Sequence, residues 1–262
     1  EPMSADSGVA MGAAYITYAR ECRKLARKKK IKPLRNLYFG QPLKYNYQLQ
    51  QNEFRVCEVT PERVAELISE GNVVAIAQGK SENGPRALGN RSILYDPRAV
   101  DGKDVVNKVK KREHWRPFAG TVLADHAQEW FNMDRLYESP HMMYAVDVLK
   151  SMIEKIPCIT HVDGTCRIQT LTEEQNPNYY KLIEAFYHLT DVPILFNTSF
   201  NLAGDTIVET IEDALKTMRE SEICYLYLPE KSELLFFPDV KESTVDLIQK
   251  ENRYLKNYYG IN

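Results

Sequence analysis

Residues 78–92 bring together the residue types that could bind an anion. The stretch follows a short apolar run at residues 73–77 and holds three glycines, two arginines and one lysine. Glycines let backbone N–H groups approach phosphate oxygens, and guanidinium groups add charge in a bidentate geometry. A structural turn with basic residues on its surface explains the same spacing equally well. The residues assigned to anion or substrate binding in this stretch are Lys80, Ser81, Gly84, Arg86 and Arg91.

Residues 108–118 form a second basic cluster, with three lysines and one arginine in its first five positions. An amphipathic helix here is expected to end at or before Arg116, because Pro117 follows it. The Arg116 guanidinium would then lie at an element boundary, near the first loop. The aromatic side chains that follow the charges would equally suit an RNA contact.

A third group of polar residues lies at residues 161–170. His161 and Asp163 are two positions apart and could suggest a metal pair, but no third ligand stands at a motif spacing. Asp163 with the glycine after it predicts a tight turn that leads into a strand. Strand alternation would place Arg167 and Gln169 on one face of that strand.

A fourth group follows the apolar run at residues 191–196. It consists of Asn197, Thr198, Ser199 and Asn201. Small hydrogen-bonding side chains at the carboxyl end of a strand are typical of a nucleotide or carbonyl pocket in an α/β sheet. A capped loop would use the same residues.

The elements that must position these groups alternate between strands and helices, which indicates an α/β fold. Residues 1–30 predict a turn and a helix with a basic end, and residues 31–53 predict a linker. Thr60 and Pro61 predict a helix start. Strands are expected at 54–59, 73–77, 121–124, 166–171, 191–196, 223–228 and 234–237, and helices at 60–71, 179–189 and 210–219.

The composition limits the class of protein. The net charge of −2 argues against a global basic field for nucleic acid, and no apolar run reaches the length of a bilayer. The five cysteines are widely spaced and contain no CxxC pair, so reduced structural thiols are favoured over a zinc site. We therefore expect a cytoplasmic protein with no membrane partner.

Four runs of residues together resemble the nodulation-type and antibiotic-biosynthesis O-carbamoyltransferases. They appear in the order of that family and cover roughly residues 55–230. Three positions depart from the family pattern: Lys80 stands where the family has Arg, Asn83 where it has an apolar or aromatic residue, and Gly120 where it has Pro, the mildest change. The matching runs are residues 84–94 with 96–98, 116–119, 161–165 and 197–201.

That resemblance implies a two-part enzyme. An N-terminal ASKHA-type domain holds a metal and transfers the carbamoyl group, and a C-terminal domain similar to threonylcarbamoyl-adenylate synthase makes carbamoyl-adenylate from carbamoyl phosphate and ATP. For this chain it implies a twisted, mostly mixed sheet flanked by helices over residues 54–262. Residues 1–30 would be the C-terminal tail of the ASKHA-type domain, in which Asp6 corresponds to a metal ligand.

The resemblance also implies roles for the site residues. Positive charge would come from Lys80, Arg86, Arg116 and Arg167, and hydrogen bonds to ATP and the carbamoyl amide from Asn197, Thr198, Ser199 and Asn201. His161 and Asp163 belong to the matched runs and are assigned to substrate binding. Arg91 and Arg98 have a structural alternative, as partners of acidic neighbours such as Asp96.

The cofactors and partners that follow are Mg²⁺ with ATP, a divalent metal such as Fe²⁺ shared with the N-terminal domain, and a hydroxyl-bearing acceptor. An N-terminal ASKHA-type domain or chain is the expected protein partner. A nucleic acid is expected as a partner only if a modified base is the hydroxyl acceptor. Three alternatives remain open. They are a non-catalytic subunit of a split carbamoyltransferase, an RNA-binding module of the same fold, and a tRNA threonylcarbamoyl enzyme.

Overall fold

The computed structural model describes residues 8–30, 32, 34–47 and 53–238. Its helices are α1 (Val9–Lys24), α2 (Pro61–Ser69), α3 (Gly102–Val109), α4 (Ala127–Trp130), α5 (Pro177–Thr190) and α6 (Ile211–Arg219). Its strands are β1 (Arg55–Glu58), β2 (Val74–Ala77), β3 (Arg91–Tyr95), β4 (Ala119–Leu123), β5 (Phe131–Asn132), β6 (Tyr144–Val148), β7 (Thr165–Leu171), β8 (Ile194–Ser199), β9 (Tyr225–Leu228) and β10 (Glu233–Phe236).

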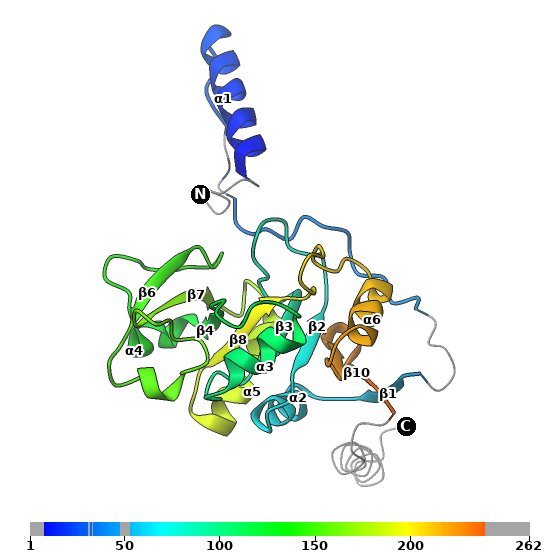
Figure 1. Cartoon of the computed structure of the whole chain (residues 1–262). Coiled ribbons are helices and arrows are strands. Elements are labelled where there is room, and N and C mark those ends of the chain that lie inside the picture. Colours follow the sequence, from blue (N-terminus) through cyan, green and yellow to red (C-terminus); the bar gives the residue numbers. More distant parts are fainter. Residues whose placement is uncertain (1–7, 31, 33, 48–52, 239–262) are drawn as a thin grey trace, which may run out of the picture.

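The ten strands form one sheet in the order β1-β10-β9-β2-β3-β8-β4-β7-β6-β5. The β2/β9 and β4/β7 pairs are parallel, and the other neighbouring pairs are antiparallel. The sheet is therefore mixed and carries helices around it (Figure 1). The expected α/β class with a mixed sheet is confirmed.

Local signals in the sequence define several element ends. The Thr60 hydroxyl accepts the Arg63 N–H and caps α2, as the Thr60-Pro61 pair predicts. A capping box between Thr210 and Asp213 opens α6. At Gly71, two residues after α2, φ is +87°, a conformation that favours glycine. These boundaries depend on neighbours a few residues away, which is why the sequence alone indicates them.

The sequence does not predict the two-residue strand β5, nor the longer strands β3 and β6. Strand β3 is fully buried, yet it begins with the charged Arg91 and directly follows the glycine-rich loop, so its sequence looks like loop. Strand β6 lies near the end of the sheet and is mostly exposed, which removes the apolar alternation that marks a strand. Both strands are formed by pairing with distant segments.

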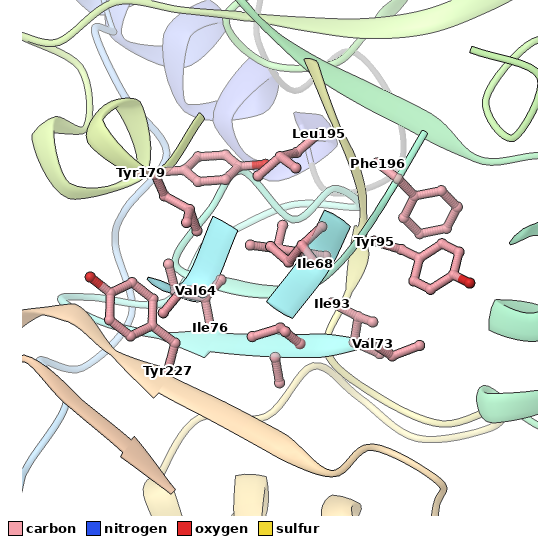
Figure 2. Close-up of a cluster of buried hydrophobic side chains, with 14 of the residues drawn as sticks. Val64, Ile68, Val73, Ile76, Ile93, Tyr95, Tyr179, Leu195, Phe196 and Tyr227 are labelled. Carbon is pink, nitrogen blue, oxygen red and sulfur yellow. The ribbon is translucent and has the colours of Figure 1, made fainter. Parts of the chain in front are cut away.

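The main core lies between the sheet and the pair of helices α2 and α5. These helices pack on each other, α2 against β2 and β3, and α5 against β4 and β8. Figure 2 shows Val64 and Ile68 of α2 in one cluster with Ile76, Tyr179 and Leu195. This packing fixes the central strands that carry the site.

Helix α1 stands away from the body of the molecule in Figure 1, and Cys22 is its one buried residue. Residues 34–47, which we call the strap, run from it across the surface of the domain. The Gly40 N–H donates to the Ser81 carbonyl, and the Leu43 N–H donates to the Gly79 carbonyl. The strap therefore lies directly on the glycine-rich loop. Within the described residues, no helix is both long and apolar enough to cross a bilayer.

Candidate functional site

The strand register brings four separate loops to one end of the sheet. Ser92 pairs with Ser199, and Ala119 pairs with both Asn197 and Arg167. The first residues of β3, β4 and β7 therefore lie beside the last residues of β8. The loops that carry the four polar groups of the sequence all enter or leave the sheet at this end.

Four arginines lie at this end: Arg86 in the glycine-rich loop, Arg112 and Arg116 in the loop between α3 and β4, and Arg167 in β7. Burial, together with the positive charges of Arg86 and Arg112, lowers the pKa of Arg167 to about 10. Burial also lowers the pKa of Arg112 to about 10, with a further contribution from Arg116. Like charges shift one another in this way only when they are close. We call Arg86, Arg112, Arg116 and Arg167 the arginine cluster.

The cluster contains hydrogen-bond donors that have no acceptor among the described residues. The Nε atoms of Arg86 and Arg167 and the Nη2 atom of Arg112 are buried without a hydrogen-bond partner in the described residues. A buried charged donor without an acceptor costs free energy, and three of them near one another cost more. An anion that accepts these N–H groups would remove both the desolvation cost and the repulsion.

The loop between α3 and β4 holds Arg112 in place. Its Nε donates to Asn107 Oδ1 at 2.6 Å, and its guanidinium lies 4.2 Å from the centre of the Phe118 ring. Asn107 is buried and its Nδ2 donates to the carbonyls of His114 and Arg116, at 3.0 and 3.2 Å. One asparagine thus organises the whole turn from residue 107 to residue 116.

Lys110 joins the cluster to the end of β8. Its Nζ donates to the Asn201 carbonyl at 2.9 Å, to Asn201 Oδ1 at 3.0 Å and to the Ser199 carbonyl. Burial lowers the pKa of Lys110 to about 7, and the charge of Arg112 adds to the effect. These residues border a cavity of about 670 Å³, which Lys110, Arg112, Arg116, Ser199 and Asn201 help to line.

Asn197 lies two strands from Arg167, with only Ala119 between them in the register. Its Nδ2 donates to Thr121 Oγ1 at 3.0 Å and to the Ala87 carbonyl at 3.3 Å, next to Arg86. Its Oδ1 is buried without a partner in the described part of the chain. Asn197 therefore ties the Arg86 loop to the sheet and keeps one free acceptor.

A model of the protein family described as "Carbamoyltransferase C-terminus" matches residues 65–232. This chain belongs to that family. It is 40% identical over 233 residues to the nodulation protein NolNO of Sinorhizobium fredii, covering 85% of this chain and 34% of that protein. It is 36% identical over 160 residues to the 3'-hydroxymethylcephem-O-carbamoyltransferase of Streptomyces clavuligerus, covering 61% of this chain and 30% of that protein. The chain thus spans about a third of the length of these relatives.

Among solved structures, E. coli YciO aligns with 64% of this chain and 76% of its own, at 13% identity and a TM-score of 0.45. A likeness at that level supports no argument. The O-carbamoyltransferase resemblance of the sequence is confirmed by the family match and the curated relatives.

Within this carbamoyltransferase domain, Arg91 lies beside the site but is committed to the fold. Its guanidinium is fully buried and donates to the carbonyls of Gln78, Gly79, Asn90 and Glu209. All five N–H groups of the side chain are thereby used. This placement favours the structural alternative over substrate binding. Arg98 likewise pairs with Asp96, at 2.6 Å.

Lys80 and Ser81 lie on the strap side of the loop. The Lys80 side chain is exposed, and its backbone bridges to Pro42. Ser81 is buried and donates its hydroxyl to the Glu209 carboxylate. Gly84 follows with φ at +123°, which suits glycine at this turn. The structure gives no contact between the Lys80 ammonium and the arginine cluster, so its phosphate role stays a prediction.

His161 and Asp163 form the turn that the sequence predicts. The Thr165 N–H and hydroxyl both donate to Asp163 Oδ1, at 3.0 and 2.8 Å, and His161 Nε2 lies 2.9 Å from the Phe118 carbonyl. They hold β7 and β4 together beside Arg167. Strand alternation places Thr198 on the opposite face from Asn197 and Ser199, in register with Ile93.

A metal site is not found in the part of the chain that the structure describes. No group of three or more His, Cys, Asp or Glu side chains there is arranged to hold an ion. Asp6, assigned to the metal of the N-terminal domain, lies outside the described residues. The cavity beside the arginine cluster offers one carboxylate, Glu113, which pairs with Arg116 at 2.7 Å. The described residues therefore do not fit a resident divalent metal.

Three residues that build the site were not singled out from the sequence. Lys110 and Arg112 lie in the second basic cluster, where a helix up to Arg116 was the expected element. The helix α3 instead ends at Val109, and the basic residues after it turn toward the cavity. Asn107 carries no sequence signal, because its role depends on the carbonyls that it meets in the folded turn.

Proposed function

We propose that this chain forms carbamoyl-adenylate from carbamoyl phosphate and ATP. The observation that carries the proposal is the arginine cluster, in which like charges lie close together at one end of the sheet and Arg86, Arg112 and Arg167 each keep a buried N–H group without a described partner. Such an arrangement is costly unless anions bind there. Membership of the carbamoyltransferase family supplies the identity of the group that is transferred.

The reaction needs this charge because both substrates are anions. Two unit charges 4 Å apart repel by about 4 kcal/mol at an effective dielectric constant near 20, and the phosphate-bearing substrates carry several charges each. Fixed guanidinium groups offset that repulsion without reorganising when the reaction occurs. The proposed site therefore lowers the barrier mainly by electrostatics.

The proposed chemistry has two steps. Carbamoyl phosphate is hydrolysed to carbamate and inorganic phosphate. A carbamate oxygen then attacks the α-phosphorus of ATP, forming the new P–O bond as the bond to pyrophosphate breaks. The products are carbamoyl-adenylate and pyrophosphate. ATP arrives with Mg²⁺ as part of the substrate, and no residue of this chain is assigned to that ion.

The side chains divide between these tasks. Arg86 and Arg167 are assigned to the phosphate of carbamoyl phosphate and then to the α-phosphate. Lys110, Arg112 and Arg116, which line the cavity of about 670 Å³, are assigned to pyrophosphate. Asn197 Oδ1, which has no partner among the described residues, is assigned to accept an N–H such as that of the carbamoyl amide. Roles for Lys80, Ser81, Thr198, Ser199 and Asn201 in ATP binding follow from the resemblance.

The test is ATP–pyrophosphate exchange measured with and without carbamoyl phosphate. The wild-type chain should exchange only when carbamoyl phosphate is present, and Arg86→Ala should lose about a hundredfold in rate, the usual effect of removing one charge-stabilising donor. Arg98→Ala is the matched control, because Arg98 pairs with Asp96 at the other end of β3. Full exchange in Arg86→Ala, or exchange without carbamoyl phosphate, would contradict the proposal.

Transfer of the carbamoyl group to a hydroxyl acceptor is proposed for the whole enzyme, by analogy with the cephem O-carbamoyltransferase among the relatives. We assign this step to an ASKHA-type domain or chain. Adding carbamoyl-adenylate to the 262-residue chain with a hydroxyl acceptor should then give no carbamoylated product. Product formation by the chain alone would contradict this division.

A further inference from the structure

Glu82 is a buried carboxylate at the base of the loop that carries Arg86. Its side chain is 5% exposed, and none of the ion pairs between described residues includes it. Its Oε1 accepts the N–H groups of Leu88, Asn90 and Arg91, at 2.7, 2.7 and 3.2 Å. Burial raises the pKa of Glu82, and the N–H groups partly offset this rise.

These hydrogen bonds close the loop. The chain leaves the sheet region at Glu82 and returns to the same carboxylate at Leu88, so that residues 83–87 are held between two fixed points. A second tie comes from the strap, because the Asn83 N–H donates to the Leu37 carbonyl at 2.7 Å. The backbone around Arg86 is therefore fixed by bonds on either side of it.

Arg86 itself contributes little to its own placement. Its one described hydrogen bond is a long contact of 3.5 Å to the carbonyl of Pro85, the residue before it. Its charge is repelled by Arg167, whose pKa it lowers. Without the loop closure, this repulsion would move Arg86 outward before any anion arrives.

We propose that Glu82 is a positioning residue that holds Arg86 beside Arg167, so that both guanidinium groups are in place for an incoming phosphate. The proposal rests on the proposed function for the identity of the anion. Its physical basis is preorganisation. The loop is already ordered when the protein folds, so no binding energy is used to order it when the anion arrives. Glu82 acts through Arg86 and does not itself touch the anion.

A double-mutant cycle tests this proposal, with pyrophosphate binding to the full chain measured by calorimetry. Glu82→Ala should weaken binding about tenfold in the wild-type background but less than about twofold in Arg86→Ala, because residues that act through one another are not additive. Glu82→Gln keeps an acceptor oxygen and should bind within about threefold of wild type. Equal losses from Glu82→Ala in both backgrounds would overturn the proposal.

Asp96→Asn is the matched control. Asp96 is also 5% exposed and accepts a backbone N–H, that of Arg98 at 2.8 Å, but it lies at the opposite end of β3. Its variant should bind pyrophosphate as wild type does. If Glu82→Ala does not fold, Glu82→Asp replaces it, since a shorter side chain keeps the charge and loses its reach to the three N–H groups. The same non-additivity with Arg86→Ala is expected.

Amide hydrogen exchange separates failure of this proposal from failure of the proposed function. Glu82→Ala should speed exchange at Leu88, Asn90 and Arg91 by about tenfold or more, while Glu82→Gln should not. If wild type binds no pyrophosphate, the proposed function fails, and the exchange rates still decide the role of Glu82. Unchanged exchange at these three amides in Glu82→Ala overturns the positioning role.

Discussion

Arg91 is fully buried and Arg167 is partly buried within the same domain, and the hydrogen bonding of their side chains differs. Arg91 donates to the carbonyls of Gln78, Gly79, Asn90 and Glu209 and is completely paired. Arg167 keeps a buried Nε without a described partner, and the charges of Arg86 and Arg112 act on it. The fold therefore uses every donor of Arg91, whereas Arg167 keeps a donor for the anion that we propose.

The difference also divides the site into two regions. In the region around Arg91, with the strap and Glu209, the guanidinium donates to four backbone carbonyls and supports the fold. The region around Arg167 is under electrostatic strain that a bound anion would relieve. Stability is expected to depend on the first region and catalysis on the second, a separation often seen where active sites trade stability for function.

The largest effect is expected from Arg91→Ala. Removing the side chain leaves several buried carbonyls unpaired, so the free energy of unfolding should fall on the order of 3 kcal/mol or more. Arg91→Lys should not restore it, since an ammonium has fewer donors and no planar fork. Urea unfolding measures both. A loss below about 1 kcal/mol would remove Arg91 from its structural role.

Arg167→Ala should show the reverse behaviour. Carbamoyl-phosphate-dependent exchange should fall about a hundredfold. The free energy of unfolding should stay within about 0.5 kcal/mol of wild type or rise, because the substitution relieves repulsion with Arg86 and Arg112 and removes an unpaired donor. Exchange rate and urea unfolding are measured on the same preparation. An unfolding loss as large as that of Arg91→Ala would erase the distinction between the two arginines.

Gly40→Ala should disturb the first region without touching the second. A Cβ at Gly40 would lie 1.8 Å from Ser81 Oγ, which hydrogen-bonds to Glu209, the residue whose carbonyl accepts from Arg91. We expect a loss of about 1–2 kcal/mol in unfolding free energy from this overpacking. Sulfate binding should change less than about twofold. A larger effect on binding than on stability would contradict the division.

The pH dependence of anion binding tests whether Lys110 belongs to the region around Arg167. The pKa of Lys110 is lowered to about 7, so its ammonium is charged below that pH and loses its proton as the pH rises through it. Sulfate, whose own charge stays constant, should bind about fivefold more weakly at about pH 8 than at about pH 6, an effect on the order of 1 kcal/mol. Lys110→Met should flatten the profile. A flat wild-type profile would remove Lys110 from the site.

Much of the fold and part of the site could be predicted from the sequence. The ends of α2 and α6 depend on the local caps Thr60 and Thr210. The meeting of the loops that carry Arg86 and Arg167 was anticipated from the family pattern. Strand β3 was missed because its first residue is charged, and only its pairing with β8 makes it a strand.

The remaining features depend on long-range contacts that local sequence cannot show. Lys110 is a site residue because Asn201, ninety-one positions away, presents its carbonyl and side-chain oxygen to it. Arg86 lies in the glycine-rich loop and Arg91 begins the strand that follows it, yet the carbonyl of Glu209 accepts hydrogen bonds only from the second. Their opposite roles follow from the tertiary structure.

The strap couples helix α1 mechanically to the glycine-rich loop. Met11 of α1 packs on the small cluster of Leu37, Leu88 and Ala119, and the Tyr38 hydroxyl donates to the Leu88 carbonyl. A displacement of α1 would therefore reach the glycine-rich loop through only a few contacts. Any partner that holds this helix would then also influence the position of Arg86 in that loop.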